Sequence, residues 1–104
     1  MATVKATFLL PVKDNDGRDL LAEIEEARSQ LWLSFRAYTN EGRVRGAYEM
    51  ADGSQATEFH EKFTLVLDDS RSGELEEVIK GFKAKTTQET MYLEIQHAVE
   101  LRLI

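Results

Sequence analysis

The sequence predicts a two-layer α+β domain in which two helices cover one face of an antiparallel sheet. Two observations support this class. Each half of the chain shows a strand-like alternation of apolar and polar residues, then a helical spacing of apolar residues, then a second alternation. The two halves are joined at Asp52-Gly53, a dipeptide typical of β-hairpin turns.

Length and composition are those of one globular domain, residues 1–104. The chain has 104 residues, of which 42% are hydrophobic and 31% are charged. A chain of this length buries about two-thirds of its unfolded surface, which is enough for a hydrophobic core. It contains no cysteine, so the sequence excludes disulfides, thiolate metal sites and cysteine nucleophiles.

The net charge and the hydropathy of the sequence indicate which partners and which cellular location to expect. The formal net charge of −6 would repel a phosphate backbone, so nucleic-acid binding is a minority interpretation. The N-terminus has no apolar run as long as that of a signal peptide, and no segment approaches the ~20 apolar residues of a membrane span. We therefore expect a cytoplasmic protein with no membrane partner.

The first strand is predicted from an alternation in which every second residue is apolar: Val4, Ala6, Phe8, Leu10 and Val12. Pro11 cannot donate a backbone hydrogen bond, so it should sit at the end of the strand or at a bulge. The polar run 13–17 ends the strand, and its Asp14, Asn15 and Asp16 suit a turn or a helix N-cap.

The first helix is predicted from apolar residues at helical spacing: Leu20, Leu21, Ile24, Ala27 and Leu31. Its end is ambiguous, because residues 32–35 could extend the helix or begin a strand. The alternation of Leu33, Phe35 and Ala37 with polar residues favours a strand from about Leu33. We expect an irregularity in it at residues 40–42, Asn-Glu-Gly, which is a turn signal.

The central hairpin is predicted to turn through the two residues Asp52-Gly53. This loop would place Ala51 opposite Ser54 and Arg45 opposite His60. It would also put Tyr48 on the buried face, with Phe59, Phe63, Leu65 and Leu67. A shift of one residue would turn the side chains of one strand to the opposite face.

The second helix is predicted from Leu75, Val78, Ile79 and Phe82, after a polar connector at residues 68–73. Glutamates in its first turns and lysines in its last complement the helix dipole. Met91, Leu93 and Ile95 then form the apolar phase of a last strand. The tail continues this phase at Val99, Leu101 and Leu103, either as a longer strand or as a short additional one.

The order β-α-β-β-α-β defines a ferredoxin-like two-layer sandwich, with four strands, or five if the tail adds one. Its helices lie on one face, and the other face is open. The residues expected on the open face are Lys5, Thr7, Leu9, Arg45, Glu49, Glu58, His60, Lys62, Tyr92, Glu94 and Gln96.

Acid–base chemistry is the reactivity that this open face could support. His60 with Glu58, or Tyr92 with Glu94, could transfer a proton. The alternative is a solvated sheet surface of mixed charge, which needs no function. His60 and His97 lack the spacing of metal ligands, and the glycines form no phosphate loop, so we expect no metal site and no cofactor.

One segment, Phe82-Lys-Ala-Lys-Thr-Thr-Gln-Glu-Thr-Met-Tyr-Leu-Glu94, resembles the end of several uncharacterised families of short bacterial ferredoxin-like proteins. In these, a helix ending in lysine is followed by Gln-Glu and by a strand of the form apolar-Tyr-apolar-Glu. The resemblance implies the same fold and no known function. Its matching positions are Gln88, Glu89, Tyr92 and Glu94. Alternatively, Gln88 and Glu89 satisfy backbone groups at the turn.

Three functions follow from these patterns. The first is a non-catalytic interaction or assembly domain, a homodimer or the binder of a protein partner through its open face. The second is a small cofactor-free enzyme of the dimeric ferredoxin-like type, with catalytic residues among His60, Glu58, Tyr92 and Glu94. An RNA-binding sheet is the third and is disfavoured by charge. The candidate binding residues are Arg45, His60, Gln88, Glu89, Tyr92 and Glu94.

Overall fold

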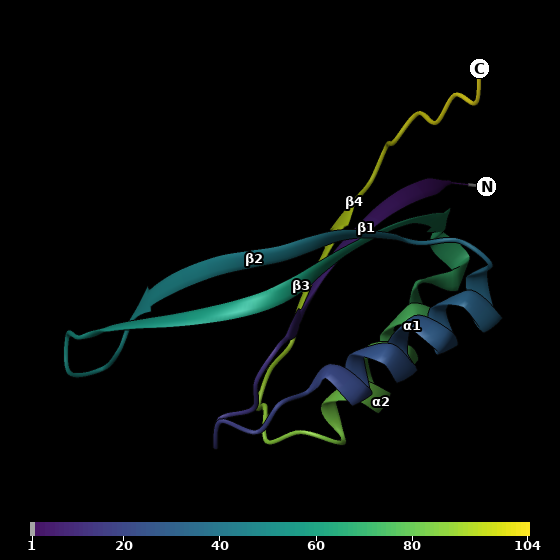
Figure 1. Ribbon diagram of the computed structural model, residues 1–104. Coiled ribbons are helices and arrows are strands. Elements are labelled where there is room, and N and C mark those ends of the chain that lie inside the picture. The colour runs from purple at the N-terminus through teal and green to yellow at the C-terminus, as the bar shows by residue number, and fades with distance from the viewer. Residues whose placement is uncertain (1) are drawn as a thin grey trace.

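Four strands and two helices follow one another in the expected order in a computed structural model that describes residues 2–104. The elements are β1 (Thr3–Pro11), α1 (Leu21–Phe35), β2 (Thr39–Glu49), β3 (Gln55–Asp68), a 3₁₀ turn (Asp69–Arg71), α2 (Ser72–Lys83) and β4 (Tyr92–Gln96). Neighbouring strands are antiparallel in the order β2-β3-β1-β4. Both helices lie on one face of this sheet (Figure 1), so the predicted ferredoxin-like α+β fold is confirmed.

The core lies between the helices and the inner face of β1 and β3. The alternation predicted for β1 is confirmed, because Val4, Ala6, Phe8, Leu10 and Val12 are all buried. The Phe8 ring stacks on the ring of Phe63 in β3, with centroids 5.3 Å apart. Apolar side chains from the helices complete the core: Leu20, Ile24, Ala27 and Leu31 around α1, and Leu75, Ile79 and Phe82 from α2.

The first helix continues through Phe35, so the prediction of a strand from Leu33 is wrong. Phe35 lies one turn after Leu31 and packs against the core. Arg36 then ends the helix in the left-handed conformation (φ 58°), and its N–H donates to the Trp32 carbonyl at 2.9 Å. Over so short a segment the apolar residues fit a helical spacing and a strand alternation equally well. The packing of Phe35 against the core favours the helix.

The hairpin turns through three residues, 51–53, and the predicted two-residue loop is wrong. The Met50 N–H donates to the Ser54 carbonyl at 2.7 Å, and the Gly53 N–H donates to the Met50 carbonyl at 2.9 Å. Gly53 has a φ of 85°, which glycine adopts without strain. The extra loop residue shifts β2 by one position, so that Arg45 pairs with Phe59 and Val44 with His60.

This shift exchanges the two faces of β2 and leaves those of β3 as predicted. The expected burial of Phe59 is wrong, however, because this residue lies in the part of the hairpin beyond the helices and is 48% exposed. Phe63, Leu65 and Leu67 face the core, whereas Glu58 and His60 lie on the open face. Tyr48, which was expected on the buried face, lies on the open face beside Glu58. Arg45 and Glu49, which were expected on the open face, lie on the helix-bearing face.

The irregularity expected at residues 40–42 is confirmed as a bulge in β2. Gly42 there has a φ of 94°. The bulge turns Asn40 towards α1, where its side-chain oxygen accepts from the Arg28 Nε at 3.1 Å. Its amide donates to the Lys62 carbonyl at 3.1 Å. Asn40 therefore joins α1 to the sheet.

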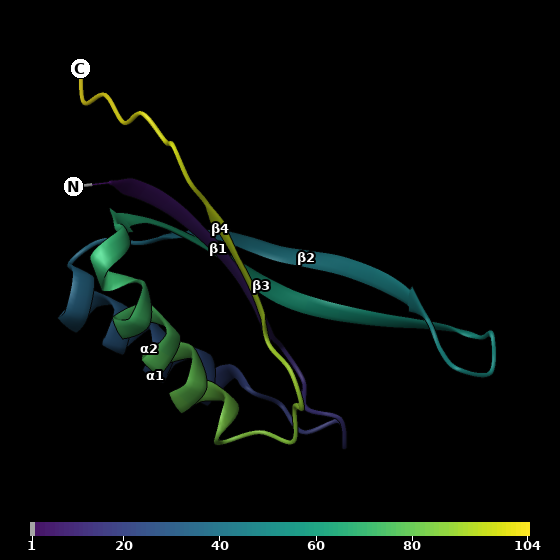
Figure 2. The ribbon, with the colours of Figure 1, turned by 180° about the vertical axis from the view of Figure 1, so that it is seen from behind.

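The tail, residues 97–104, belongs to no strand, so the described chain has four strands and not five. Ala98 has a φ of 59°, which interrupts the extended backbone after β4. Leu101, Leu103 and Ile104 are exposed. Figure 2 shows the tail running on past the end of the sheet.

The distal half of the hairpin extends beyond the rest of the molecule (Figure 1). β1 pairs with β3 only from His60 to Asp68, so residues 45–59 form a two-stranded ribbon, which we call the hairpin arm. The radius of gyration is 14.7 Å, whereas a compact chain of this length has about 13 Å. The arm therefore makes the molecule elongated, with extents of 46 × 27 × 24 Å.

No helix within residues 2–104 combines the length and the hydropathy that crossing a bilayer requires.

Two phenylalanines of β3 test this description of the core. Phe63 is 0% exposed and Phe59 is 48% exposed, although both lie on the helix-bearing face of one strand. Phe63→Ala should lower the free energy of unfolding by about 3–5 kcal/mol, because it leaves a cavity beneath Phe8. Phe59→Ala, the matched control, should cost less than about 1 kcal/mol. Urea unfolding followed by circular dichroism measures both, and equal losses would contradict the core described here.

Candidate functional site

A hollow on the open face contains most of the residues that the sequence singled out. It lies where the hairpin arm leaves the sheet, beside the connection from α2 to β4, and has a volume of about 410 Å³. We call it the open-face hollow. It is lined by Leu9, Pro11, Asn15, Tyr48, Glu58, His60, Gln88, Glu89, Thr90, Met91 and Tyr92.

Strand geometry explains why these side chains meet. Alternation along β3 places Glu58 and His60 on the open face, and Pro11 at the end of β1 pairs with His60. Tyr92 begins β4 directly opposite Leu9. The last residues of β1, the first of β4 and the base of the arm therefore surround one depression.

Glu58 is the centre of a small polar cluster in the hollow. The His60 Nε2 lies 3.3 Å from the Glu58 Oε2, and the Tyr48 hydroxyl donates to the Glu58 Oε1 at 3.3 Å. The negative charge of Glu58 raises the pKa of Tyr48 above its usual value, and desolvation adds to this effect. A carboxylate that contacts an imidazole and a phenol can orient the imidazole for proton transfer.

Tyr92 and Glu94 form a second pair on β4. The Tyr92 hydroxyl donates to the Glu94 Oε2 at 3.0 Å, and this hydrogen bond raises the pKa of Tyr92. Tyr92 lines the hollow, whereas Glu94, two residues further along β4, does not. The side chains of both predicted pairs are therefore in contact, and one member of the second pair lies outside the hollow.

Arg45 is not part of this site. The corrected hairpin register turns it to the opposite face, where its guanidinium lies 6.0 Å from the centroid of the Phe59 ring. The expected neighbour of His60 across the hairpin is replaced by Val44. The expectation that Arg45 and His60 form one binding surface is wrong because the loop has one more residue than the prediction allowed.

Gln88 and Glu89 differ in their roles. The Gln88 side-chain amide donates to the Asp14 Oδ1 at 3.3 Å and to the Asn15 Oδ1 at 3.2 Å. Gln88 therefore joins the α2–β4 connection to the β1–α1 connection. Its amide donates to side chains, whereas the alternative interpretation of the sequence expected it to satisfy backbone groups at the turn. Glu89 lines the hollow and adds a second carboxylate to it.

Asp14 is the residue that sequence reasoning missed. It was assigned to a turn or a cap, but its side chain is only 1% exposed. It accepts hydrogen bonds from the Thr87 hydroxyl at 2.6 Å, the Thr87 N–H at 2.9 Å and the Asn15 N–H at 3.0 Å. The Thr87 hydroxyl makes the largest contribution in lowering the pKa of Asp14 to about 2. No local signal marks this carboxylate, since its main partner lies 73 residues away.

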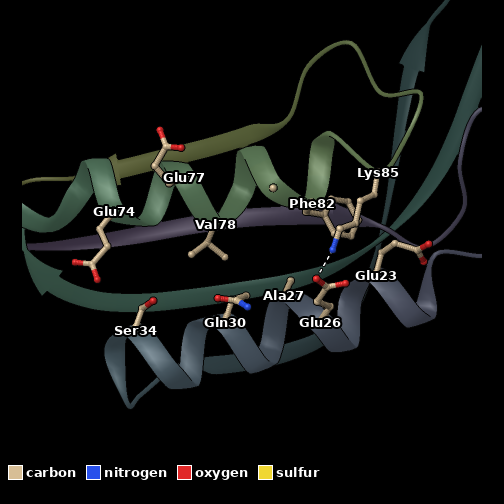
Figure 3. Close-up of a pocket in the computed structure, with 11 residues that line it drawn as sticks. Glu23, Glu26, Ala27, Gln30, Ser34, Glu74, Glu77, Val78, Phe82 and Lys85 are labelled. Atoms are coloured by element: carbon tan, nitrogen blue, oxygen red, sulfur yellow. Dashed lines mark ion pairs between the residues drawn. The ribbon is translucent and has the colours of Figure 1, made fainter.

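A second depression, between the two helices on the outer side of the molecule, is acidic. Its volume is about 410 Å³ and its walls carry Glu23, Glu26, Glu74 and Glu77. Figure 3 shows Lys85 reaching across the depression to Glu26, with which it forms an ion pair. Ala27, Val78 and Phe82 also line it. This depression is the seam where α1 meets α2.

Metal binding receives no support from the described residues. Within residues 2–104, no three histidine, aspartate or glutamate side chains lie close enough together to hold a metal ion.

Comparison with known proteins identifies the fold and no family. No protein-family model matches the sequence, and no curated protein matches it. Among solved structures, CutA1 from Oryza sativa is similar with a TM-score of 0.72 at 10% identity, covering 98% of this chain and 84% of that one. A Bacillus cereus protein related to NIF3 is similar with a TM-score of 0.65 at 12% identity, covering 95% of this chain. This chain spans 26% of that protein.

Asp14 leads to a prediction about pH. Its pKa in the folded protein, about 2, lies below its usual 3.8, so the unfolded chain binds its proton more tightly. The stability that Asp14 contributes is therefore present above about pH 4 and is lost as the pH falls towards 2. Asp14→Asn should flatten this part of the stability–pH profile, as measured by urea unfolding at a series of pH values.

Thr87→Val provides the matched test of the same interaction. It removes the hydroxyl donor and keeps the size of the side chain, so it should lower the free energy of unfolding at pH 7 by about 1.5–3 kcal/mol. Thr90→Val, at an exposed position nearby, is the control and should have little effect. An unchanged acid profile in both Asp14→Asn and Thr87→Val would contradict the role assigned to this carboxylate.

Proposed function

We propose that this protein is a non-catalytic assembly domain that associates with a second copy of itself through surfaces that its helices leave uncovered. The hairpin arm is the observation that supports this function. It is a two-stranded ribbon whose Tyr48, Met50 and Phe59 are all exposed. Isolated two-stranded hairpins are marginally stable in water, and a third strand or a packed face is needed to stabilise them.

The open face of the sheet adds to this argument. Tyr92 and Val66 are exposed on it, and both helices pack on the other side. Tyr92 lies directly opposite Leu9 of β1 on this face, and adjacent apolar side chains on an uncovered surface are typical of interaction sites. The likeness to CutA1 and to the NIF3-related protein supports the fold that presents these surfaces and carries no information on assembly.

Size-exclusion chromatography with light scattering tests this function. We expect twice the monomer mass at tens of micromolar, with dissociation on dilution. The tyrosine and phenylalanine of the arm should contribute, so the double variant Tyr48→Ser/Phe59→Ser should shift the equilibrium towards monomer while keeping its far-ultraviolet circular dichroism spectrum. A monomer mass for the natural sequence at high micromolar concentration would contradict self-assembly.

A second candidate function is supported by the open-face hollow. The contact of 3.3 Å between the His60 Nε2 and the Glu58 Oε2 lies in a depression that is large enough for a small molecule. In this hypothesis the protein is a small cofactor-free enzyme, in which His60 accepts a proton and Glu58 orients the imidazole. Tyr48 and Tyr92 would position the bound compound.

Thermal-shift measurements with a panel of small organic acids and amines test this second function. A compound that occupies the hollow should raise the melting temperature of the natural protein and should lose its effect in His60→Gln and in Glu58→Gln. His97→Gln, at an exposed position outside the hollow, is the matched control. Equal shifts in all three variants would rule out this site.

A further inference from the structure

β2 is an edge strand of the sheet, and the structure shows few of the usual devices that block such an edge. In the order β2-β3-β1-β4, β2 has a strand beside it on one side only. Proteins protect edge strands by keeping them short, by bulges, by proline, and by charged side chains, lysine above all. Residues 43, 45 and 49 of β2 are charged, but they carry both signs, so they repel a second copy only in some registers. β2 has eleven residues and neither proline nor lysine, and its bulge lies at its beginning, between Asn40 and Gly42. Residues 43–49 therefore form a regular edge.

The hydrogen bonds of the hairpin show which backbone groups of this edge point outward. The Met50 N–H donates to the Ser54 carbonyl, so this pair is hydrogen-bonded within the hairpin. Such pairs alternate along an antiparallel ladder, which turns the backbone groups of Val44, Gly46 and Tyr48 towards β3. The backbone groups of the intervening residues point away from the sheet: Arg43, Arg45, Ala47 and Glu49.

A second copy of β2 can pair with this edge in several registers, and one of them is more favourable than the registers on either side of it. When two copies pair antiparallel about a two-fold axis, one residue lies opposite itself. An axis at Arg45 would place two arginines opposite each other, which is unfavourable. An axis at Ala47 would also oppose unlike charges, Arg45 and Glu49, but it would bring Arg43 opposite the loop and leave three hydrogen-bonded pairs in the ladder where the Gly46 axis gives four. An axis at Gly46 places Arg43 opposite Glu49 twice and opposes no like charges.

We infer that β2 pairs with β2 of a second copy, antiparallel, about a two-fold axis at Gly46. This inference rests on the proposed assembly function and names the edge and register through which assembly occurs. The four outward-facing residues form hydrogen-bonded pairs, which make about eight hydrogen bonds across the axis. Val44 lies opposite Tyr48 of the second copy on the open face, so apolar contact accompanies the ladder.

Gly46 provides separate support for this axis. A Cβ built at Gly46 meets nothing within 4 Å, and its φ is not in the positive range that favours glycine. The fold of a single copy therefore does not require glycine at this position. Its presence there needs another reason, because glycine weakens a strand. A glycine inside a strand often marks the close approach of another backbone. At the proposed axis the two Gly46 residues form a pair without hydrogen bonds, where Cα atoms approach to about 4.5 Å.

Cysteine cross-linking tests the register directly, because the natural chain has no cysteine. In Gly46→Cys the two introduced thiols would face each other at a Cα separation suited to a disulfide, about 4.4–6.8 Å. We expect a covalent dimer under oxidised glutathione on a non-reducing gel. Ala47→Cys is the matched control, since each copy would face Arg45 of the other and the two thiols would be offset by two residues.

A charge exchange tests the same register without introducing a thiol. Arg43→Glu and Glu49→Arg each place like charges opposite one another, so each should raise the dimer dissociation constant, by about tenfold, in sedimentation equilibrium. The double variant Arg43→Glu/Glu49→Arg restores opposite charges and should return the constant towards its natural value. Circular dichroism melting of each variant verifies that the monomer fold is intact.

The outcomes separate this inference from the function on which it rests. A dimer that resists both charge variants and gives no Gly46→Cys cross-link would overturn pairing through β2, while assembly through another surface would stand. Preferential cross-linking of Ala47→Cys would overturn the Gly46 axis. A natural protein that is monomeric in light scattering would overturn the proposed function together with this inference.

Discussion

The pairing of β1 with β3 in the centre of the sheet is the interaction on which the rest of the structure depends. Phe8 stacks on Phe63 across this pair, and both helices pack on the surface that the two strands share. Within the sheet, β4 pairs only with β1, and β2 pairs only with β3. Weakening the central pair would therefore loosen the helices and both edges together, because each edge strand has a single neighbour within the described sheet.

A group of hydrogen bonds around Asp14 also joins the two halves of the chain. Asp14 lies after β1, and Thr87 lies before β4, so their hydrogen bonds connect the two loops that lead into and out of the helical layer. Gln88 strengthens this tie through Asp14 and Asn15. The same connection forms one wall of the open-face hollow, so a structural contact also shapes the candidate site.

The length of β2 and β3 distinguishes this chain from a minimal two-layer sandwich. The helices cover only the part of the sheet that β1 spans, and the hairpin arm continues beyond it. An arm with apolar side chains and an accessible strand edge is costly to leave in water. The proposed assembly would remove this cost. In the polar cluster, Glu58 and His60 lie on β3, away from the edge of the sheet, whereas Tyr48 lies on β2 and belongs both to the cluster and to the proposed interface.

The sequence alone predicts the architecture, because the apolar residues that form the core recur at regular short spacings along β1, β3, α1 and α2. It also places Glu58 and His60 on the open face, since the phase of β3 is set by Phe63, Leu65 and Leu67.

Three features become visible only in the packed molecule. The end of α1 depends on where Phe35 packs, and the faces of β2 depend on a single additional loop residue after Met50. The burial of Asp14 depends on Thr87, 73 residues later. Local periodicity describes which face of an element is apolar, whereas loop length, helix termination and buried polar contacts are settled by groups that are distant in the chain.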